Sequence, residues 1–145
     1  MIQLAYPHYQ FRLRRYQDRE QVFDSIRKKW VALTPEEWVR QHFVQYLLQT
    51  KEYPAGMIAI EKKIMLGERI KRFDILVYDN MHKPWLMVEC KGADIELNDD
   101  VMHQLLRYNM AIPVPFLVIT NGAASYFFER TGEGMCAIAE LPVWK

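Results

Sequence analysis

The sequence feature that most constrains the fold is a pair of apolar runs separated by a short segment rich in turn residues. The runs are Arg72–Tyr78 (RFDILVY) and Trp85–Lys91 (WLMVECK). The residues between them, 79–84, include Asp, Asn and Pro, which favour turns. Two such runs joined by a turn predict an antiparallel β-hairpin in the interior of a sheet.

One register of this hairpin brings its charged residues together. From the turn outward, the pairs are Tyr78 with Trp85, Leu76 with Met87, Asp74 with Glu89, and Arg72 with Lys91. Strand side chains alternate with a period of two, so these pairs share one face. Directly opposed residues have Cβ atoms about 4.5–5.5 Å apart. The other face is apolar, with Ile75, Val77, Leu86 and Val88.

The predicted pairing of Asp74 with Glu89 carries chemical consequences. Two adjacent carboxylates repel each other, and one pKa rises unless they share a cation. Mg²⁺ (or Mn²⁺) prefers oxygen ligands and takes one or two carboxylates, so we predict that both residues bind metal. The backbone carbonyl of Cys90 is a natural third ligand, and its thiol should turn to the buried face. Lys91 lies on the same side as Glu89 and can orient a water or stabilise charge on a phosphate.

The ordinary alternative is a salt-bridge cluster on a solvated strand end. It fits most isolated Glu-x-Lys sequences. In this chain the neighbouring apolar residues indicate interior strands, and charged ends on interior strands favour a functional site.

The other expected elements surround this hairpin. A helix should begin after Thr34, with Thr34 as N-cap, Pro35 in the first turn and Glu37 completing a capping box, and run to about Gln49. A second helix should follow Asn98 and end near Ala111. Strands are expected at 9–15, 22–25, 57–64, 116–120, 125–130 and 135–141, the first two forming an N-terminal hairpin. This order predicts a mixed α/β (α+β) fold around a sheet.

The chain of 145 residues, without repeats or a Ser/Gly-rich linker, suits one domain spanning 1–145. We expect an N-terminal extension over 1–30 and a core over 31–130. Net charge is only +1, but residues 1–72 hold 14 Lys and Arg against 8 Asp and Glu, and residues 73–145 hold 5 against 10. This asymmetry fits a basic face toward a phosphate backbone, and it fits two differently charged solvated surfaces equally well.

Location is predicted from three further features. No apolar run approaches the roughly 20 residues that span a bilayer, so no membrane partner is expected. The N-terminus lacks the apolar segment of a secretory signal. Two cysteines without a disulfide framework suit a reducing compartment. The expected location is therefore the cytoplasm.

Several motifs together resemble a known family. Asp74, followed by Glu89-Cys90-Lys91, looks like the D…(D/E)-x-K signature of the restriction-endonuclease-like PD-(D/E)xK nuclease superfamily. The segments LTPEEWVRQ (33–41), KRFD (71–74), VECKG (88–92) and QLLRYN (104–109) resemble the N-terminal nuclease region of type I restriction enzyme R subunits. Small stand-alone bacterial members are the most similar. The resemblance covers roughly residues 25–130.

The resemblance implies a central mixed sheet flanked by helices with an α-β-β-β-α-β core, and hydrolysis of DNA with Mg²⁺ or Mn²⁺. Asp74 and Glu89 would bind metal and Lys91 would be the catalytic lysine. The family also has a glutamate on the first helix. Glu36 is preferred over Glu37 because it shares a helix face with apolar residues, whereas Glu37 has a capping task.

The resemblance also assigns residues around this centre. Gln104 and Tyr108 are four residues apart on one helix face, and the family's Gln-x-x-x-Tyr lies beside the metal and positions substrate. The alternative is that Tyr108 belongs to the core and Gln104 to the surface. Arg72 contacts phosphate or holds Asp74, with the two equally favoured. Glu61 is a further acid near the site or, more simply, a solvated strand end.

The departures from the family pattern limit its meaning. Phe73 replaces the usual proline, no phosphate-binding loop of an ATP-driven motor is present, and no DNA-reading motif is recognisable. The predicted function is a metal-dependent deoxyribonuclease in restriction, defence or repair. The alternative is a catalytically weak or inactive DNA- or partner-binding module of the same fold. A homodimer or a larger assembly fits either. The segment 27–30 (RKKW) contacts phosphate or a base, or is a solvated turn.

Overall fold

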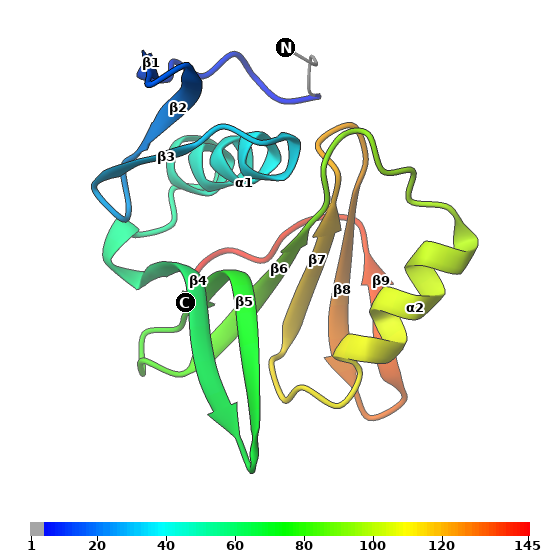
Figure 1. Cartoon of the computed structure of the whole chain (residues 1–145). Helices are drawn as coiled ribbons and strands as arrows, with labels where there is room; N and C mark the ends of the chain where they lie inside the picture. Colours follow the sequence, from blue (N-terminus) through cyan, green and yellow to red (C-terminus); the bar gives the residue numbers. More distant parts are fainter. Residues whose placement is uncertain (1–4) are drawn as a thin grey trace.

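The computed structural model describes residues 5–145, which form two α-helices and two β-sheets (Figure 1). The smaller sheet contains β1 (Leu13–Tyr16), β2 (Arg19–Asp24) and β3 (Lys29–Ala32), all antiparallel. The larger sheet contains β4 (Ile58–Leu66), β5 (Arg69–Tyr78), β6 (Pro84–Cys90), β7 (Phe116–Thr120), β8 (Ser125–Thr131) and β9 (Gly134–Ile138). The helices are α1 (Pro35–Gln45) and α2 (Asp99–Asn109). These elements confirm the predicted α+β class.

The strands of the larger sheet follow their order in the chain, β4-β5-β6-β7-β8-β9. All neighbours are antiparallel except β6 and β7, which are parallel. A parallel pair needs a crossover, and α2 supplies it. The carboxyl end of β6 therefore lies beside that of β7, and Lys91 N–H continues the pairing by donating to the Thr120 carbonyl at 2.8 Å.

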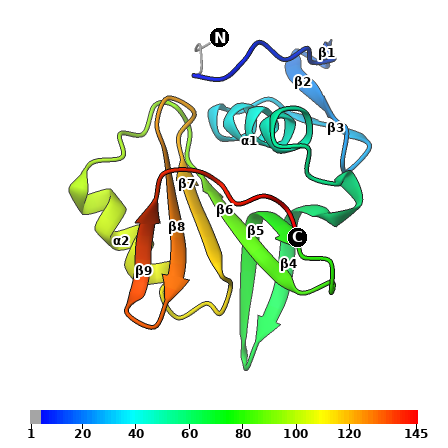
Figure 2. The ribbon, with the colours of Figure 1, turned by 180° about the vertical axis from the view of Figure 1, so that it is seen from behind.

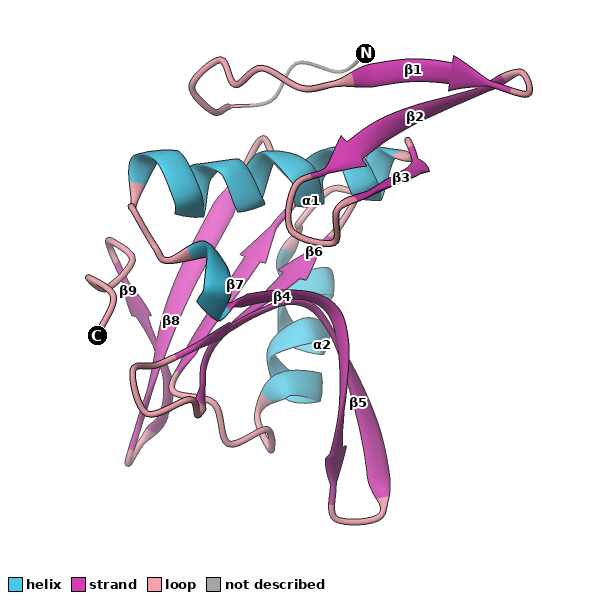
Figure 3. Cartoon of the chain, turned by 90° about the vertical axis from the view of Figure 1, so that its left-hand side faces the viewer, coloured by secondary structure: helices cyan, strands magenta, loops and turns pink. Residues whose placement is uncertain are grey.

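The two helices cover opposite faces of the larger sheet (Figures 1 and 3). On the α1 side, Val39, Phe43 and Leu47 pack against strand residues such as Ile75 and Val88. The α2 side holds a second cluster that includes Phe73, Leu76, Met87, Leu117 and Ile119. The carboxyl-terminal segment crosses the face of the larger sheet that is turned toward the viewer in Figure 2, and Leu141 joins the α1-side cluster. The sheet thus has a buried core on both faces.

The start of α1 follows the predicted capping. The Thr34 hydroxyl accepts a hydrogen bond from Glu37 N–H at 3.0 Å, and Pro35 occupies the first turn. The helix continues as a π-helical segment, η1 (Tyr46–Thr50), and a short 3₁₀ turn, η2 (Ala55–Met57), precedes β4. The Glu37 carboxylate is committed to arginine and glutamine partners described below, not to the reciprocal half of the predicted capping box.

The N-terminal hairpin is confirmed, although its first strand is shorter and its second strand longer than predicted. A third strand, β3, was not predicted. Gln17 and Asp18 both have positive φ, of 50° and 61°, as a two-residue type I′ turn requires. β3 lies where a basic turn was one of the expectations. Lys28, at φ 55°, ends that turn, and Trp30 then pairs with Phe23.

The predicted register of the β5–β6 hairpin is confirmed for Ile75 with Val88, Leu76 with Met87, and Val77 with Leu86. Three of the predicted pairs, Tyr78–Trp85, Asp74–Glu89 and Arg72–Lys91, are not part of the ladder. A bulge between Val77 and Tyr78 pairs Tyr78 with Pro84, which turns Trp85 into the α1-side cluster. The ladder also ends at Ile75–Val88, before it reaches Asp74 with Glu89 or Arg72 with Lys91. On the other edge of β5, Arg72 pairs with Lys63 of β4. The turn residues are compatible both with a regular hairpin and with a bulged one, so the sequence pattern alone does not reveal the bulge.

Neither α-helix of the described chain has the length and apolar character of a membrane-spanning segment.

Candidate active site

Strand β5 changes its face at Asp74. Phe73 belongs to the α2-side cluster, whereas Ile75, only two residues further, belongs to the α1-side cluster. In a regular strand these two side chains would share a face. Across from Asp74 on β4 lies Glu61, whose φ is 53° and which interrupts the pairing between Ile60–Ile75 and Lys62–Phe73. This left-handed residue costs on the order of 1–3 kcal/mol, and such conformations cluster at functional sites.

Both oxygens of Asp74 have fixed partners. Oδ1 accepts from Arg40 Nη2 of α1 at 3.3 Å, and Oδ2 accepts from the backbone N–H of Cys90 at 2.8 Å. The carboxylate is therefore held between α1 and the end of β6. Arg40, not Arg72, is the residue that holds it. Arg72 instead pairs with Glu61 at 2.5 Å, and its side chain is 54% exposed.

Glu89 lies next to Asp74 at the end of β6. Burial raises the pKa of Glu89 above its ordinary value, and the negative charge of Asp74 raises it further. A side-chain hydrogen bond to Asp74 acts in the same direction, while Lys71 and Lys91 oppose the rise. The two carboxyl groups that the register argument paired are therefore in electrostatic contact. The Cys90 thiol is turned away, 1% exposed in the α1-side core, as expected.

Glu36 joins this group from the first turn of α1. Its pKa is raised by burial and then by the charge of Asp74, and lowered in part by Arg40 and Lys91. Its Oε1 lies 3.0 Å from Arg40 Nη2. The close approach depends on Gly92, because a Cβ there would lie 3.0 Å from the Pro35 side chain and 2.4 Å from that of Asp94.

Glu37, the competing residue, has a different environment. The expectation that Glu36 lies on the buried helix face is wrong, since its side chain is 49% exposed and that of Glu37 is 8% exposed. Glu37 contacts Arg40 at 2.7 Å, Arg27 at 3.0 Å and Gln41 at 3.1 Å. The reason is the small sheet, whose Asp24 and Arg27 reach the same side of α1. Glu36 therefore lies near Asp74, whereas Glu37 forms buried ion pairs and a hydrogen bond between α1 and the small sheet.

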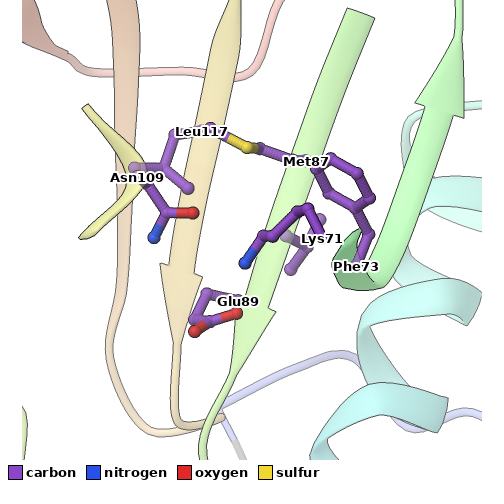
Figure 4. Close-up of a pocket in the computed structure, with 7 residues that line it drawn as sticks. Lys71, Phe73, Met87, Glu89, Asn109 and Leu117 are labelled. Carbon is purple, nitrogen blue, oxygen red and sulfur yellow. The ribbon is translucent and has the colours of Figure 1, made fainter. Parts of the chain in front are cut away.

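Lys71 is a candidate site residue that the sequence reading missed. It is only 7% exposed, and its Nζ lies 4.4 Å from the ring centroid of Tyr108 and 5.6 Å from that of Phe73. Within residues 5–145 it forms no ion pair. Figure 4 shows the Lys71 amino group and the Glu89 carboxylate pointing into one recess, with Asn109 of α2 at its side. The sequence favours Arg72 over Lys71 as a site residue, because in a regular strand Arg72 shares a face with Asp74. Alternation alone does not reveal that β5 changes its face at Asp74.

The two predicted residues of α2 are both exposed. Tyr108 is 61% exposed and reaches the site through Lys71. Gln104 lies one helical turn earlier, without a hydrogen bond to another described residue, and its role stays a prediction. The alternative in which Tyr108 belongs to the core is therefore wrong.

The sequence also predicted which groups would bind a metal ion. Among residues 5–145, no three His, Cys, Asp or Glu side chains gather closely enough to hold a metal ion. The predicted set of Asp74, Glu89 and the Cys90 carbonyl contains only two such side chains, and it stays a prediction.

Comparison with protein families now places the chain. Residues 35–142 match the family described as the type I restriction enzyme R protein N terminus. The chain belongs to this family, as the motifs indicated, and is thereby related to restriction enzymes. The match runs from the start of α1 past β9 and includes Glu36, Asp74, Glu89, Lys91 and Tyr108, but it excludes β1–β3. Searches among curated proteins and solved structures returned no match.

Proposed function

We propose that this protein is a divalent-metal-dependent nuclease that hydrolyses DNA phosphodiester bonds, with Asp74, Glu89 and Lys91 at its centre. The observation that carries the proposal is the hydrogen bond from Cys90 N–H to Asp74 Oδ2 at 2.8 Å, which places the Asp74 carboxylate beside the end of β6, where Glu89 lies. The charge of Asp74 then adds to burial in raising the pKa of Glu89. Like charges held together at strand ends cost free energy, and a shared cation removes that cost. Membership of a restriction-enzyme family supports the same chemistry.

The donor set suits a hard divalent cation. Asp74 and Glu89 offer carboxylate oxygens, the ligands that Mg²⁺ and Mn²⁺ prefer. The N–H of Cys90 is directed at Asp74, and the N–H and C=O of a strand residue face the same edge, which supports the Cys90 carbonyl as a third ligand. When bound, the metal would polarise the scissile phosphate and lower the pKa of an attacking water.

The remaining residues of the chain have separable tasks. Arg40 and the Cys90 amide orient Asp74, as hydrogen-bonded outer groups orient carboxylates in metal centres. Lys91 assists the water or stabilises charge on the phosphate. Glu36, beside Asp74, is a second proton-accepting or ligand-orienting group. Lys71 is a cation for a phosphate oxygen because it forms no ion pair within residues 5–145.

Substrate contacts are proposed at the edge of this centre. Tyr108 borders Lys71, and Gln104 precedes it by one turn of α2, so both line the approach from that side. Arg72 lies on the opposite side, exposed and next to Glu61, where it can contact a phosphate. DNA is the proposed partner, and a dimer or a larger restriction or repair assembly stays a prediction.

The proposed function also implies a restriction-endonuclease-like core. The order α1, β4, β5, β6, α2, β7 has the succession α-β-β-β-α-β that the resemblance implied, with β6 and β7 parallel. This order supports the assignment of the fold family.

The direct test is cleavage of supercoiled, linear and branched DNA by the purified protein with Mg²⁺ or Mn²⁺, and with EDTA as the metal-free arm. We expect Lys91→Met and Asp74→Ala to lower the cleavage rate by about 10²-fold or more. Lys83→Met is the matched control for Lys91→Met, because Lys83 is exposed in the β5–β6 turn. Full cleavage by Asp74→Ala and Lys91→Met, or cleavage undiminished by EDTA, would contradict the proposal.

A further inference from the structure

The small sheet β1–β3 has two chemically different faces. The inner face packs on α1: Val22 and Asp24 are fully buried, and Asp24 accepts from Gln41 Nε2 at 2.9 Å. The outer face follows from the register and the alternation of side chains. It consists of Arg12, Arg14, Tyr16, Arg19, Gln21, Phe23, Trp30 and Ala32. Figure 3 shows this sheet above α1, on the side away from the larger sheet.

Arginines and aromatic rings interleave on the outer face. The Arg14 guanidinium lies 4.3 Å from the ring centroid of Trp30 and 4.9 Å from that of Tyr16. The Arg12 guanidinium lies 4.5 Å from Phe23 and 5.4 Å from Trp30. Trp30 and Phe23 also contact each other edge to face, with centroids 5.4 Å apart. The guanidinium groups of Arg12 and Arg14 thus lie over aromatic rings, and both side chains are exposed.

No acidic residue lies on this face to neutralise its charge. Arg12, Arg14 and Arg19 are exposed and form no ion pair with another described residue. Arg14 donates only to an amide, Gln21 Oε1, at 2.7 Å. Arg27, in contrast, is paired with Asp24 at 2.7 Å and with Glu37 at 3.0 Å. The positive charge of the outer face therefore has no role inside the described chain.

We propose that the outer face of β1–β3 is a binding surface for single-stranded DNA. Unpaired bases stack on aromatic rings and on guanidinium planes, and phosphates bind the same arginines from outside. Tyr16 is 51% exposed and offers a free ring face. A duplex hides the faces of its bases inside the stack, so aromatic rings on this sheet cannot stack on them. A single strand is therefore the form of DNA that uses both the charge and the rings.

The surface lies outside the family match, yet it is continuous with the candidate active site. An open cleft of about 510 Å³ is lined by Lys29 and Trp30 of β3 together with Glu36 and Arg72. A strand bound on the outer face can follow this cleft toward Asp74. This link to cleavage rests on the proposed function, whereas strand binding does not, because it requires neither metal nor turnover.

The test is fluorescence anisotropy of a labelled single-stranded oligodeoxythymidylate of about 20 nucleotides with the full chain, in EDTA so that cleavage plays no part. We expect the double variant Arg12→Gln/Arg14→Gln to weaken binding at least tenfold. The slope of log affinity against log salt should fall by about 1.4, since each single-strand phosphate contact contributes about 0.7.

The matched control is Arg15→Gln/Lys28→Gln, which removes the same charge from the same small sheet. Arg15 is exposed on β1 next to Arg14 but on the opposite face, and Lys28 is exposed in the turn before β3. We expect it to change affinity less than threefold. Tyr16→Ala tests stacking at an exposed position that the fold does not need, and it should weaken binding roughly tenfold with an unchanged salt slope.

Four outcomes would overturn the proposal. They are equal losses in the two double variants, binding of duplex DNA or single-stranded RNA tighter than single-stranded DNA, full affinity of Tyr16→Ala, and no binding at low salt. Cleavage of the same oligonucleotide by the wild-type chain with Mn²⁺ is measured in parallel. A protein that binds DNA but never cleaves it would therefore contradict the proposed function and leave the strand-binding surface intact.

Discussion

The cations on the two sides of Asp74 differ in what they are bonded to. On the α1 side, Arg40 contacts Glu36, Glu37, Glu61 and Asp74 within 3.4 Å. On the other side, Lys71 and Lys91 act on Glu89 through their charge without a close ion pair among residues 5–145. The cations near Asp74 therefore have two different tasks. Arg40 stabilises the fold through its ion pairs, whereas Lys71 and Lys91 remain available to a ligand.

The arginine side is an interlocked network. Burial lowers the pKa of Arg40, but its carboxylate neighbours, Glu37 foremost, raise it overall, so the guanidinium stays charged. The planar fork of arginine can serve several carboxylates at once, which a lysine cannot do as well. The lysine side has compact charges beside an aromatic ring and a carboxyl group, which suits transient contact with phosphate.

The largest expected effect is on stability, from Arg40→Met. Removing this guanidinium leaves Glu37 buried without one of its main partners, and breaking a buried pair costs about 3–5 kcal/mol. We expect the free energy of unfolding to fall by about that amount in urea denaturation. Arg72→Met is the control, because its partner Glu61 and its own side chain are partly exposed, and we expect less than about 1 kcal/mol. Equal losses in the two variants would remove the distinction between the two classes of cation.

The adjacent glutamates of α1 give the next effect. Glu37→Gln should lower the free energy of unfolding by about 2 kcal/mol, because two arginines and Gln41 converge on its carboxylate. Glu36→Gln should change it by less than about 1 kcal/mol, since Glu36 is half exposed, but should slow DNA cleavage. Unfolding curves and cleavage rates of both variants check this. A reversed pattern, with Glu37→Gln folded normally but inactive, would assign the catalytic glutamate to position 37.

The smallest effect separates function from stability at Lys71. Lys71→Met keeps the length of the side chain and removes a buried charge, so unfolding should be unchanged or slightly less favourable. DNA cleavage should slow by about tenfold because a cation for phosphate is lost. Lys62→Met, at an exposed position of β4, is the control. If Lys71→Met cleaves DNA at the wild-type rate, Lys71 serves only packing against Tyr108.

Much of the fold followed from short-range rules. The capping residues of α1 and α2 were recognisable because Thr34 and Asn98 have side chains that accept backbone N–H groups. The central register of β5 and β6 followed from alternation and a turn of known length. The bulge at Tyr78 did not, because it depends on how Trp85 packs against Tyr53 and Phe116, which are distant in sequence.

The candidate site was predictable only in its acidic half. The predicted register brought Asp74 and Glu89 together, but β5 changes its face at Asp74, across from the left-handed Glu61. Lys71, for which no role was predicted, therefore lies beside Glu89, and Arg72 does not. No local pattern marks a residue such as Glu61. The strand β3 was missed for a related reason, since its four residues gain their structure from pairing with β2 and contact with α1. Both the change of face in β5 and the formation of β3 depend on tertiary contacts, which the local sequence does not reveal.

The central claim is that Asp74 and Glu89 form a metal centre. Calorimetric titration of Mn²⁺ into the full chain tests it most directly, with the wild-type protein compared with Asp74→Asn, Glu89→Gln and Lys91→Met. We expect a site in the wild-type protein that weakens at least tenfold in the first two variants and persists in Lys91→Met, because a lysine is not a ligand. Mn²⁺ binding of wild-type strength in Asp74→Asn and Glu89→Gln, or no binding to the wild-type protein, would contradict the claim.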